Sequence, residues 1–173
     1  MKYIFYSQIK LIRVLFIVCL TVIAVDAKAK AISVLYPTTG NDVKGVVQFT
    51  EVPGGVLITA QLSGLSPGKH GFHIHEYGDC SGADGKTAGG HFNPHGKHHS
   101  GPNKPERHVG DLGNILADKE GNATYTRVDT HVTIESIIGK SLIVHAKEDD
   151  LTSQPTGAAG PRVACGVIGI AKE

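Results

Sequence analysis

The stretch from His70 to Asp111 constrains this 173-residue chain more than any other feature of its sequence. It contains eight of the ten histidines in the chain, together with a cysteine and several carboxylates. Imidazole and carboxylate groups are common metal ligands, and packing alone rarely explains a segment so crowded with them. The stretch therefore predicts a fold organised around bound metal.

Two histidines of this stretch are spaced as in a β-strand. His73 and His75 alternate with the apolar residues Phe72 and Ile74. Because residues i and i+2 of a strand point to the same face, both imidazoles can reach one ion. The pattern predicts a strand over His70–Glu76 that carries a pair of ligands.

The following segment, residues 78–110, predicts a long loop. It is rich in Gly, Pro, Asn, Asp and Ser and has no apolar periodicity. Long loops are uncommon in compact domains unless they are functional or disordered, and ligands that bind an ion would order this one. His91 and His99 are the candidate ligands within it, and His108 and Asp111 offer a nitrogen and an oxygen where the next strand begins.

The other two loop histidines fit a looser role. A histidine-rich loop can be a metal-sequestering tract, and single histidines are often ordinary surface residues. We favour that interpretation for His95 and His98.

The N-terminus has the features of an export signal. Residues 1–29 combine early basic residues with an uncharged apolar run of twelve residues, too short for a transmembrane helix of about 20 residues. Cleavage is expected after Ala27 or Ala29, leaving residues 30–173 as a single domain without stable membrane insertion. An uncleaved membrane anchor is the alternative.

The cysteines agree with export. Removal of the signal removes Cys19 and leaves Cys80 and Cys165, which are expected to form a disulfide in an oxidising compartment. The alternative is two buried free thiols.

Charge excludes one class of partner. Cleavage after Ala29 leaves 13 basic and 15 acidic residues, a net charge of −2. No basic helix is visible, so the chain is not expected to bind nucleic acid.

Short apolar runs between turn residues predict an all-β sandwich or barrel of about eight strands, with no helix longer than a turn or two. The expected strands are Ala31–Tyr36, Val43–Thr50, Val56–Ser63, His70–Glu76, Gly113–Ala117, Ala123–Val128, Leu142–Lys147 and Val163–Ile170. His145 lies inside one of them. Alone it would be typical of a buried core histidine, but a neighbouring ligand pair makes it a third candidate ligand.

A cation is expected beside this site. Arg162 precedes Cys165 by three residues, so a Cys80–Cys165 disulfide would hold the arginine against the metal loop. A cation beside a metal is unfavourable unless an anion comes there, which points to a small anionic substrate.

Several segments in this order resemble the copper/zinc superoxide dismutase family from about residue 31 to the C-terminus. They are GFHIHEYGDC, GGHFNP, ERHVGDLGN, IVHAKEDDL and RVACGVIGIA. The resemblance implies an eight-stranded Greek-key β-barrel with long metal-binding and electrostatic loops. It also implies copper and zinc as cofactors.

The resemblance assigns the residues as follows. The copper ligands it implies are His73, His75, His91 and His145, and the zinc ligands are His91, His99, His108 and Asp111. Asp149 corresponds to a carboxylate that joins a copper histidine to a zinc histidine. Arg162 corresponds to the arginine that guides the anion, His91 bridges the metals, and Cys80 and Cys165 form the family disulfide.

The implied activity is disproportionation of superoxide to oxygen and hydrogen peroxide by copper redox cycling, with zinc structural. The catalytic residues are then Arg162 and His91. A non-catalytic copper/zinc carrier or buffer on the same fold is the alternative. Export to the periplasm is favoured, with secretion second, and the C-terminal segment GVIGIA resembles dimeric members, which favours a homodimer.

Two departures from animal family members concern loops. The loop between Asp149 and Arg162 is shorter and lacks their charged guiding residues; Lys147, Lys97 or Lys104 are candidate substitutes. The segment from Cys80 to His91 is longer and resembles that of exported bacterial members.

Overall fold

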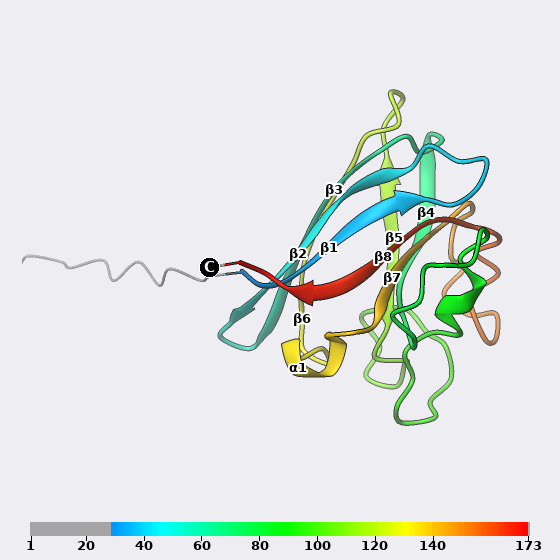
Figure 1. The fold of residues 1–173 in the computed structure, drawn as a ribbon. Helices are drawn as coiled ribbons and strands as arrows, with labels where there is room; N and C mark the ends of the chain where they lie inside the picture. Colours follow the sequence, from blue (N-terminus) through cyan, green and yellow to red (C-terminus); the bar gives the residue numbers. More distant parts are fainter. Residues whose placement is uncertain (1–28, 173) are drawn as a thin grey trace, which may run out of the picture.

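A computed structural model describes residues 29–172, which form a closed antiparallel barrel of eight strands (Figure 1). The strands are β1 (Ala29–Pro37), β2 (Lys44–Val52), β3 (Gly55–Ser63), β4 (Gly68–His75), β5 (Asp111–Ala117), β6 (Ala123–Asp129), β7 (Ser141–His145) and β8 (Arg162–Ile170). The predicted all-β class and strand number are confirmed. The predicted export signal lies outside the described residues, apart from Ala29.

The order of strands around the barrel is β1-β2-β3-β6-β5-β4-β7-β8. Hairpins join β1 to β2 and β2 to β3, whereas β3 pairs with β6 and β4 pairs with β7. These non-consecutive neighbours make the Greek-key arrangement that the resemblance implied. Closure pairs β1 with β8, so no sheet edge is left open.

Alternation of apolar and polar residues fills the barrel. In β3 the buried residues Val56, Ile58, Ala60 and Leu62 alternate with more exposed ones. Phe49 from β2 is fully buried in the same cluster. This period of two is the pattern expected of strands with one face in a core.

Helical structure in the described range is short. α1 spans Ile134–Ile137 and is capped by Thr133, and η1, a 3₁₀ turn, spans Lys86–Ala88. Neither is long and apolar enough to cross a membrane, and no other helix of the described chain is.

Two long connections lie together on one side of the barrel (Figure 1). Residues 76–110 join β4 to β5, and residues 146–161 join β7 to β8. The predicted disulfide is confirmed: Cys80 in the first connection is bonded to Cys165 in β8, with Cα atoms 5.7 Å apart. It closes a sequence separation of 85 residues and fixes the first connection to the barrel wall.

Two strands end earlier than predicted. β7 ends at His145 rather than Lys147, because the pairing register with β8 shifts between Val144 and His145. The backbone N–H groups of Ala146 and Lys147 donate instead to carbonyls of the 146–161 connection. β4 ends at His75 rather than Glu76, whose N–H donates to the carbonyl of Gly90.

Candidate metal centre

Four imidazoles from three parts of the chain converge at the barrel wall. His73 and His75 come from β4, His145 from the end of β7, and His91 from the 76–110 connection. One nitrogen of each ring lies within 4.8 Å of the corresponding atoms of the other three, and all four residues are buried. We call this set the four-imidazole group.

Each ring of this group has one nitrogen engaged by the protein. His75 Nδ1 donates to the Gly89 carbonyl at 2.9 Å, and His145 Nδ1 donates to the Gly160 carbonyl at 3.0 Å. His73 Nε2 lies 2.7 Å from Asp149 Oδ2. These contacts hold the rings and determine which nitrogen faces the centre.

The opposite nitrogens are the ones that face each other. His73 Nδ1 and the Nε2 atoms of His75, His91 and His145 are buried without a hydrogen-bond partner in the described part of the chain. A buried polar atom without a partner is costly, and four together are explained by a metal ion. The residues therefore fit copper, which accepts imidazole ligands in a tetragonal arrangement.

A second set shares His91 with the first. Its members are His91, His99, His108 and Asp111, all buried, and we call it the mixed group. The Nδ1 atoms of the three histidines lie 2.8, 2.9 and 3.2 Å from Asp111 Oδ1. One carboxylate oxygen surrounded by three imidazole nitrogens fits a tetrahedral ion, whose bonds of about 2.0–2.1 Å place ligands roughly 3.3 Å apart. This donor set suits zinc.

Asp149 joins the two groups. Its Oδ2 faces His73 Nε2 and its Oδ1 faces His99 Nε2 at 2.9 Å. The side chains of all three residues are fully buried. Gly157, with a φ of 64°, passes so close that a Cβ there would collide with the Asp149 carboxylate and with His99. The carboxylate thus lies in a niche that only glycine leaves open.

Burial keeps the imidazoles of the four-imidazole group neutral. Desolvation is the main cause that lowers the pKa of His73 and His75 well below the usual value, and it lowers the pKa of His145 to about 4. Burial also lowers the pKa of His91. A neutral imidazole has the lone pair that a metal requires, so burial favours the metal-binding form of these four rings near neutral pH.

The pKa values of the two buried carboxylates, Asp111 and Asp149, are lowered, although burial of an isolated carboxylate raises its pKa. Burial alone would raise the pKa of Asp111, but hydrogen bonds with His108, His91 and His99 hold it far below its usual range. Hydrogen bonds with His73 and His99 likewise override burial and lower the pKa of Asp149. Both are therefore charged at neutral pH, as a metal ligand and its partner must be.

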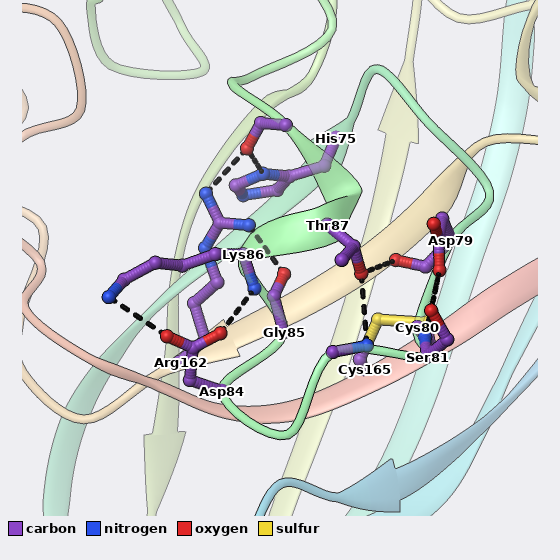
Figure 2. Close-up of a disulfide and its surroundings, with 12 residues drawn as sticks. His75, Asp79, Cys80, Ser81, Asp84, Gly85, Lys86, Thr87, Arg162 and Cys165 are labelled. Atoms are coloured by element: carbon purple, nitrogen blue, oxygen red, sulfur yellow. Dashed lines mark hydrogen bonds and ion pairs between the residues drawn. A yellow bond between two sulfur atoms is a disulfide. The ribbon is translucent and has the colours of Figure 1, made fainter.

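Arg162 lies against the metal loop, as the sequence predicts (Figure 2). Its guanidinium donates to the carbonyl of Gly85 at 2.6 Å and to that of Gly89 at 2.5 Å. The Gly89 carbonyl also accepts from His75, so one backbone oxygen links the arginine to the four-imidazole group. Arg162, His145 and Lys86 line an open hollow of about 480 Å³.

The remaining histidines lie outside both groups. His95 and His98 are exposed, and His98 does not replace its neighbour His99. His70 is buried, but its ring is engaged by the carbonyls of His145 and Ser66. Across residues 29–172 no third group of three or more potential metal ligands is found.

The fold and site define a β-barrel metalloprotein with two adjacent metal sites that share a histidine. Comparison with known proteins identifies the class further. The sequence profile of the family described as copper/zinc superoxide dismutase matches residues 43–168. An extracellular superoxide dismutase [Cu-Zn] of Brugia pahangi is 45% identical over 154 residues, covering 82% of this chain and 76% of the relative. A superoxide dismutase [Cu-Zn] of Paramecium bursaria Chlorella virus 1 is 50% identical over 142 residues, covering 76% of this chain and 75% of the relative.

The chain belongs to the copper/zinc superoxide dismutase family. It is accordingly an oxidoreductase with copper and zinc as its metals, as the resemblance implied, and the carrier alternative is not favoured.

Several residues that lie around the two metal groups were missed in the sequence analysis. Lys86 lines the hollow, whereas Lys97, a suggested guiding residue, is paired with Glu106 at 2.5 Å. The side-chain amides of Asn114 and Gln154 contact the backbone of Asp149 and His99. A lysine or an amide in a polar loop has no distinguishing spacing, so only the folded loop could reveal these contacts.

Replacement of Asp149 should weaken zinc binding more than copper binding. Asp149→Asn keeps the shape but presents an NH₂ group to one of two imidazole N–H groups, so we expect zinc affinity to fall about 10–100-fold. Copper should be lost less, because His75 and His145 keep their own carbonyl partners. Metal content after dialysis against a chelator measures both. Asp150→Asn is the control, since the exposed Asp150 carboxylate accepts hydrogen bonds from Thr152 and Ser153 and belongs to neither metal group. Equal loss of zinc in both variants would contradict the assignment.

Proposed function

We propose that this chain disproportionates superoxide at the four-imidazole group with copper bound there, and that the mixed group holds a structural zinc. The observation that carries the proposal is the set of four buried imidazole nitrogens that have no hydrogen-bond partner among residues 29–172 and face one another beside Arg162. A carrier has no need of a guanidinium held over an open hollow. An enzyme that takes a small anion does.

Bound copper would supply one-electron chemistry, oxidising one superoxide to oxygen and reducing a second to peroxide, while zinc supplies fixed charge and structure. Side chains of the protein bind the anion, deliver a proton and hold the His91 ring in position. Arg162 binds the anion electrostatically at the hollow. His91 Nε2, which faces the centre, can hold a proton and deliver it to the developing peroxide, and solvent supplies the second proton. The mixed group keeps the His91 ring in place through Asp111.

Removal of the arginine should slow the reaction without removing copper. With Arg162→Ala we expect superoxide decay per copper to fall about tenfold at low salt, because the guiding charge is lost. Pulse radiolysis on protein of known copper and zinc content makes the measurement. The parent protein should approach diffusion-limited decay that falls as salt rises. Fully metallated parent protein without catalytic decay would refute the function, and unchanged low-salt decay in Arg162→Ala would refute the role of the arginine.

Lys86 is the best-placed additional guiding charge. It begins η1, lies in the segment after Cys80 and lines the same hollow as Arg162. Its Nζ pairs with Asp84 at 2.8 Å, and both side chains are exposed (Figure 2). The two charges oppose each other at the mouth of the hollow, so each contributes to the field that an incoming anion meets.

Substitutions at this pair should change the rate in opposite directions. Lys86→Ala should lower low-salt decay roughly two- to threefold, and Asp84→Asn should raise it by a similar factor. Both differences should shrink in high salt, as pulse radiolysis across a salt series would show. Lys119→Ala is the charge-matched control, because Lys119 is exposed in the turn at the far end of β5 from Asp111. Rates that change in the same direction for Lys86→Ala and Asp84→Asn would contradict guidance by this pair.

The proposed compartment is the periplasm, with secretion as the second candidate. The Cys80–Cys165 disulfide supports an oxidising compartment and therefore export. Residues 1–29 are proposed as the export signal, with cleavage after Ala27 or Ala29. N-terminal sequencing of the exported protein would identify the cleavage site.

A homodimer is proposed through the face formed by β1 and β8. Tyr36 is 68% exposed and Ile170 is 80% exposed there, beside the exposed Val34 and Val167. An uncharged groove of about 540 Å³ runs across this face next to the disulfide. A second copy fits it, because a two-fold contact brings the same apolar residues together from both chains.

A charge placed on this face should separate the dimer. Val167→Lys puts an ammonium where the two apolar faces meet, so we expect a monomer. Analytical ultracentrifugation measures the mass. Leu116→Lys, at a residue of β5 that is 64% exposed against 44% for Val167, should leave the dimer intact. A monomeric parent protein, or a dimer that persists in Val167→Lys, would contradict this interface.

A further inference from the structure

One side-chain amide holds the backbone of a mixed-group residue from both sides. Gln154 Oε1 accepts from the backbone N–H of His99 at 2.7 Å, and Gln154 Nε2 donates to the His99 carbonyl at 2.8 Å. The same Nε2 also donates to the carbonyl of Thr152 at 3.1 Å. Gln154 belongs to the 146–161 connection, which contributes no member of the mixed group.

Two other amides make the same paired contact. Asn114 donates to the Asp149 carbonyl at 2.9 Å and accepts from the Asp149 N–H at 2.8 Å. Asn93 donates to the Lys97 carbonyl and accepts from the Lys97 N–H, both at 2.9 Å. That carbonyl also accepts from His108 Nε2 at 3.0 Å. In all three cases the residue held by the amide is either a member of the mixed group or the hydrogen-bond partner of one.

The contacts of His99 are the most complete of the three. Asp149 holds its ring nitrogen Nε2, and Gln154 holds its backbone N–H and carbonyl. Both come from the same connection. With backbone and ring held from one side, the remaining nitrogen, Nδ1, points to Asp111.

We propose that Gln154 is a positioning residue for zinc, which slows zinc release by holding the backbone of His99. The inference rests on the proposed assignment of zinc to the mixed group. The connection that ends directly before Arg162 thereby also determines how firmly zinc is retained. Partners of metal ligands commonly have this effect, because they fix the ligand before the ion arrives.

Only an amide of this length makes both contacts. Glutamate keeps an acceptor for the His99 N–H but places a second oxygen against the His99 carbonyl. Alanine removes both contacts, and asparagine is one methylene shorter. The exposed position of Gln154 means that its loss creates no cavity in the barrel, so these variants are expected to fold.

The test measures zinc and copper release from the fully metallated protein to a chromogenic chelator. In Gln154→Ala and Gln154→Glu we expect zinc release to be about tenfold faster, with copper release unchanged. Cobalt bound at the mixed group gives a second measurement, because its visible spectrum reports the ligand geometry. We expect that spectrum to change in both variants.

Gln61→Ala is the matched control, since Gln61 is an exposed residue of β3 on the barrel wall. Zinc release within about twofold of the parent in both Gln154 variants would overturn the proposal. Equal acceleration of zinc and copper would also overturn it, because that result indicates general loosening of the connection. Neither measurement uses dismutase activity. If the metallated parent protein is inactive but zinc release alone is faster in the Gln154 variants, the result counts against the proposed function and not against the role of Gln154.

Discussion

The shared carboxylate of Asp149 is the interaction on which both metal groups depend. It lies fully buried between His73 Nε2 and His99 Nε2, one ring from each group. A buried charge is tolerated only where hydrogen bonds replace the lost water, and here both oxygens have an imidazole partner. A displacement of this carboxylate would move a ligand of each site at once. The groups are therefore joined twice, through Asp149 and through the common ring of His91.

The barrel and the two long connections hold the histidines of the metal groups in position by different means. His73, His75 and His145 lie on paired strands, so backbone hydrogen bonds of the sheet place three members of the four-imidazole group. His99 and His108 lie in the last part of the 76–110 connection, residues 92–110, which forms no helix or strand. Their positions depend on side chains, on the disulfide at Cys80 and on backbone contacts between connections. The proposed zinc site is thus the part whose geometry needs the most support from outside its own ligands.

This difference explains what the sequence could predict. Strand alternation placed His73 and His75 on one face, and turn residues between apolar runs predicted eight strands. Those patterns are local in the sequence, so they can be interpreted without knowledge of the fold. The contacts of Gln154 and Asn114 could not be predicted, because each joins residues tens of positions apart through a loop conformation. The end of β7 was missed for the same reason, since a register shift against β8 ends it.

The engaged nitrogens also explain how the chain can distinguish two metals before either is bound. Carbonyl partners on the Nδ1 atoms of His75 and His145 leave Nε2 for the metal, whereas the Asp149 partner on His73 leaves Nδ1. The four-imidazole group therefore offers neutral nitrogens alone and suits an ion that tolerates an open, tetragonal arrangement. The mixed group adds the charged oxygen of Asp111 and closes a tetrahedron. The protein thus determines the donor type and the ring tautomer. Its hydrogen bonds fix which donor atoms face each site before the ion binds.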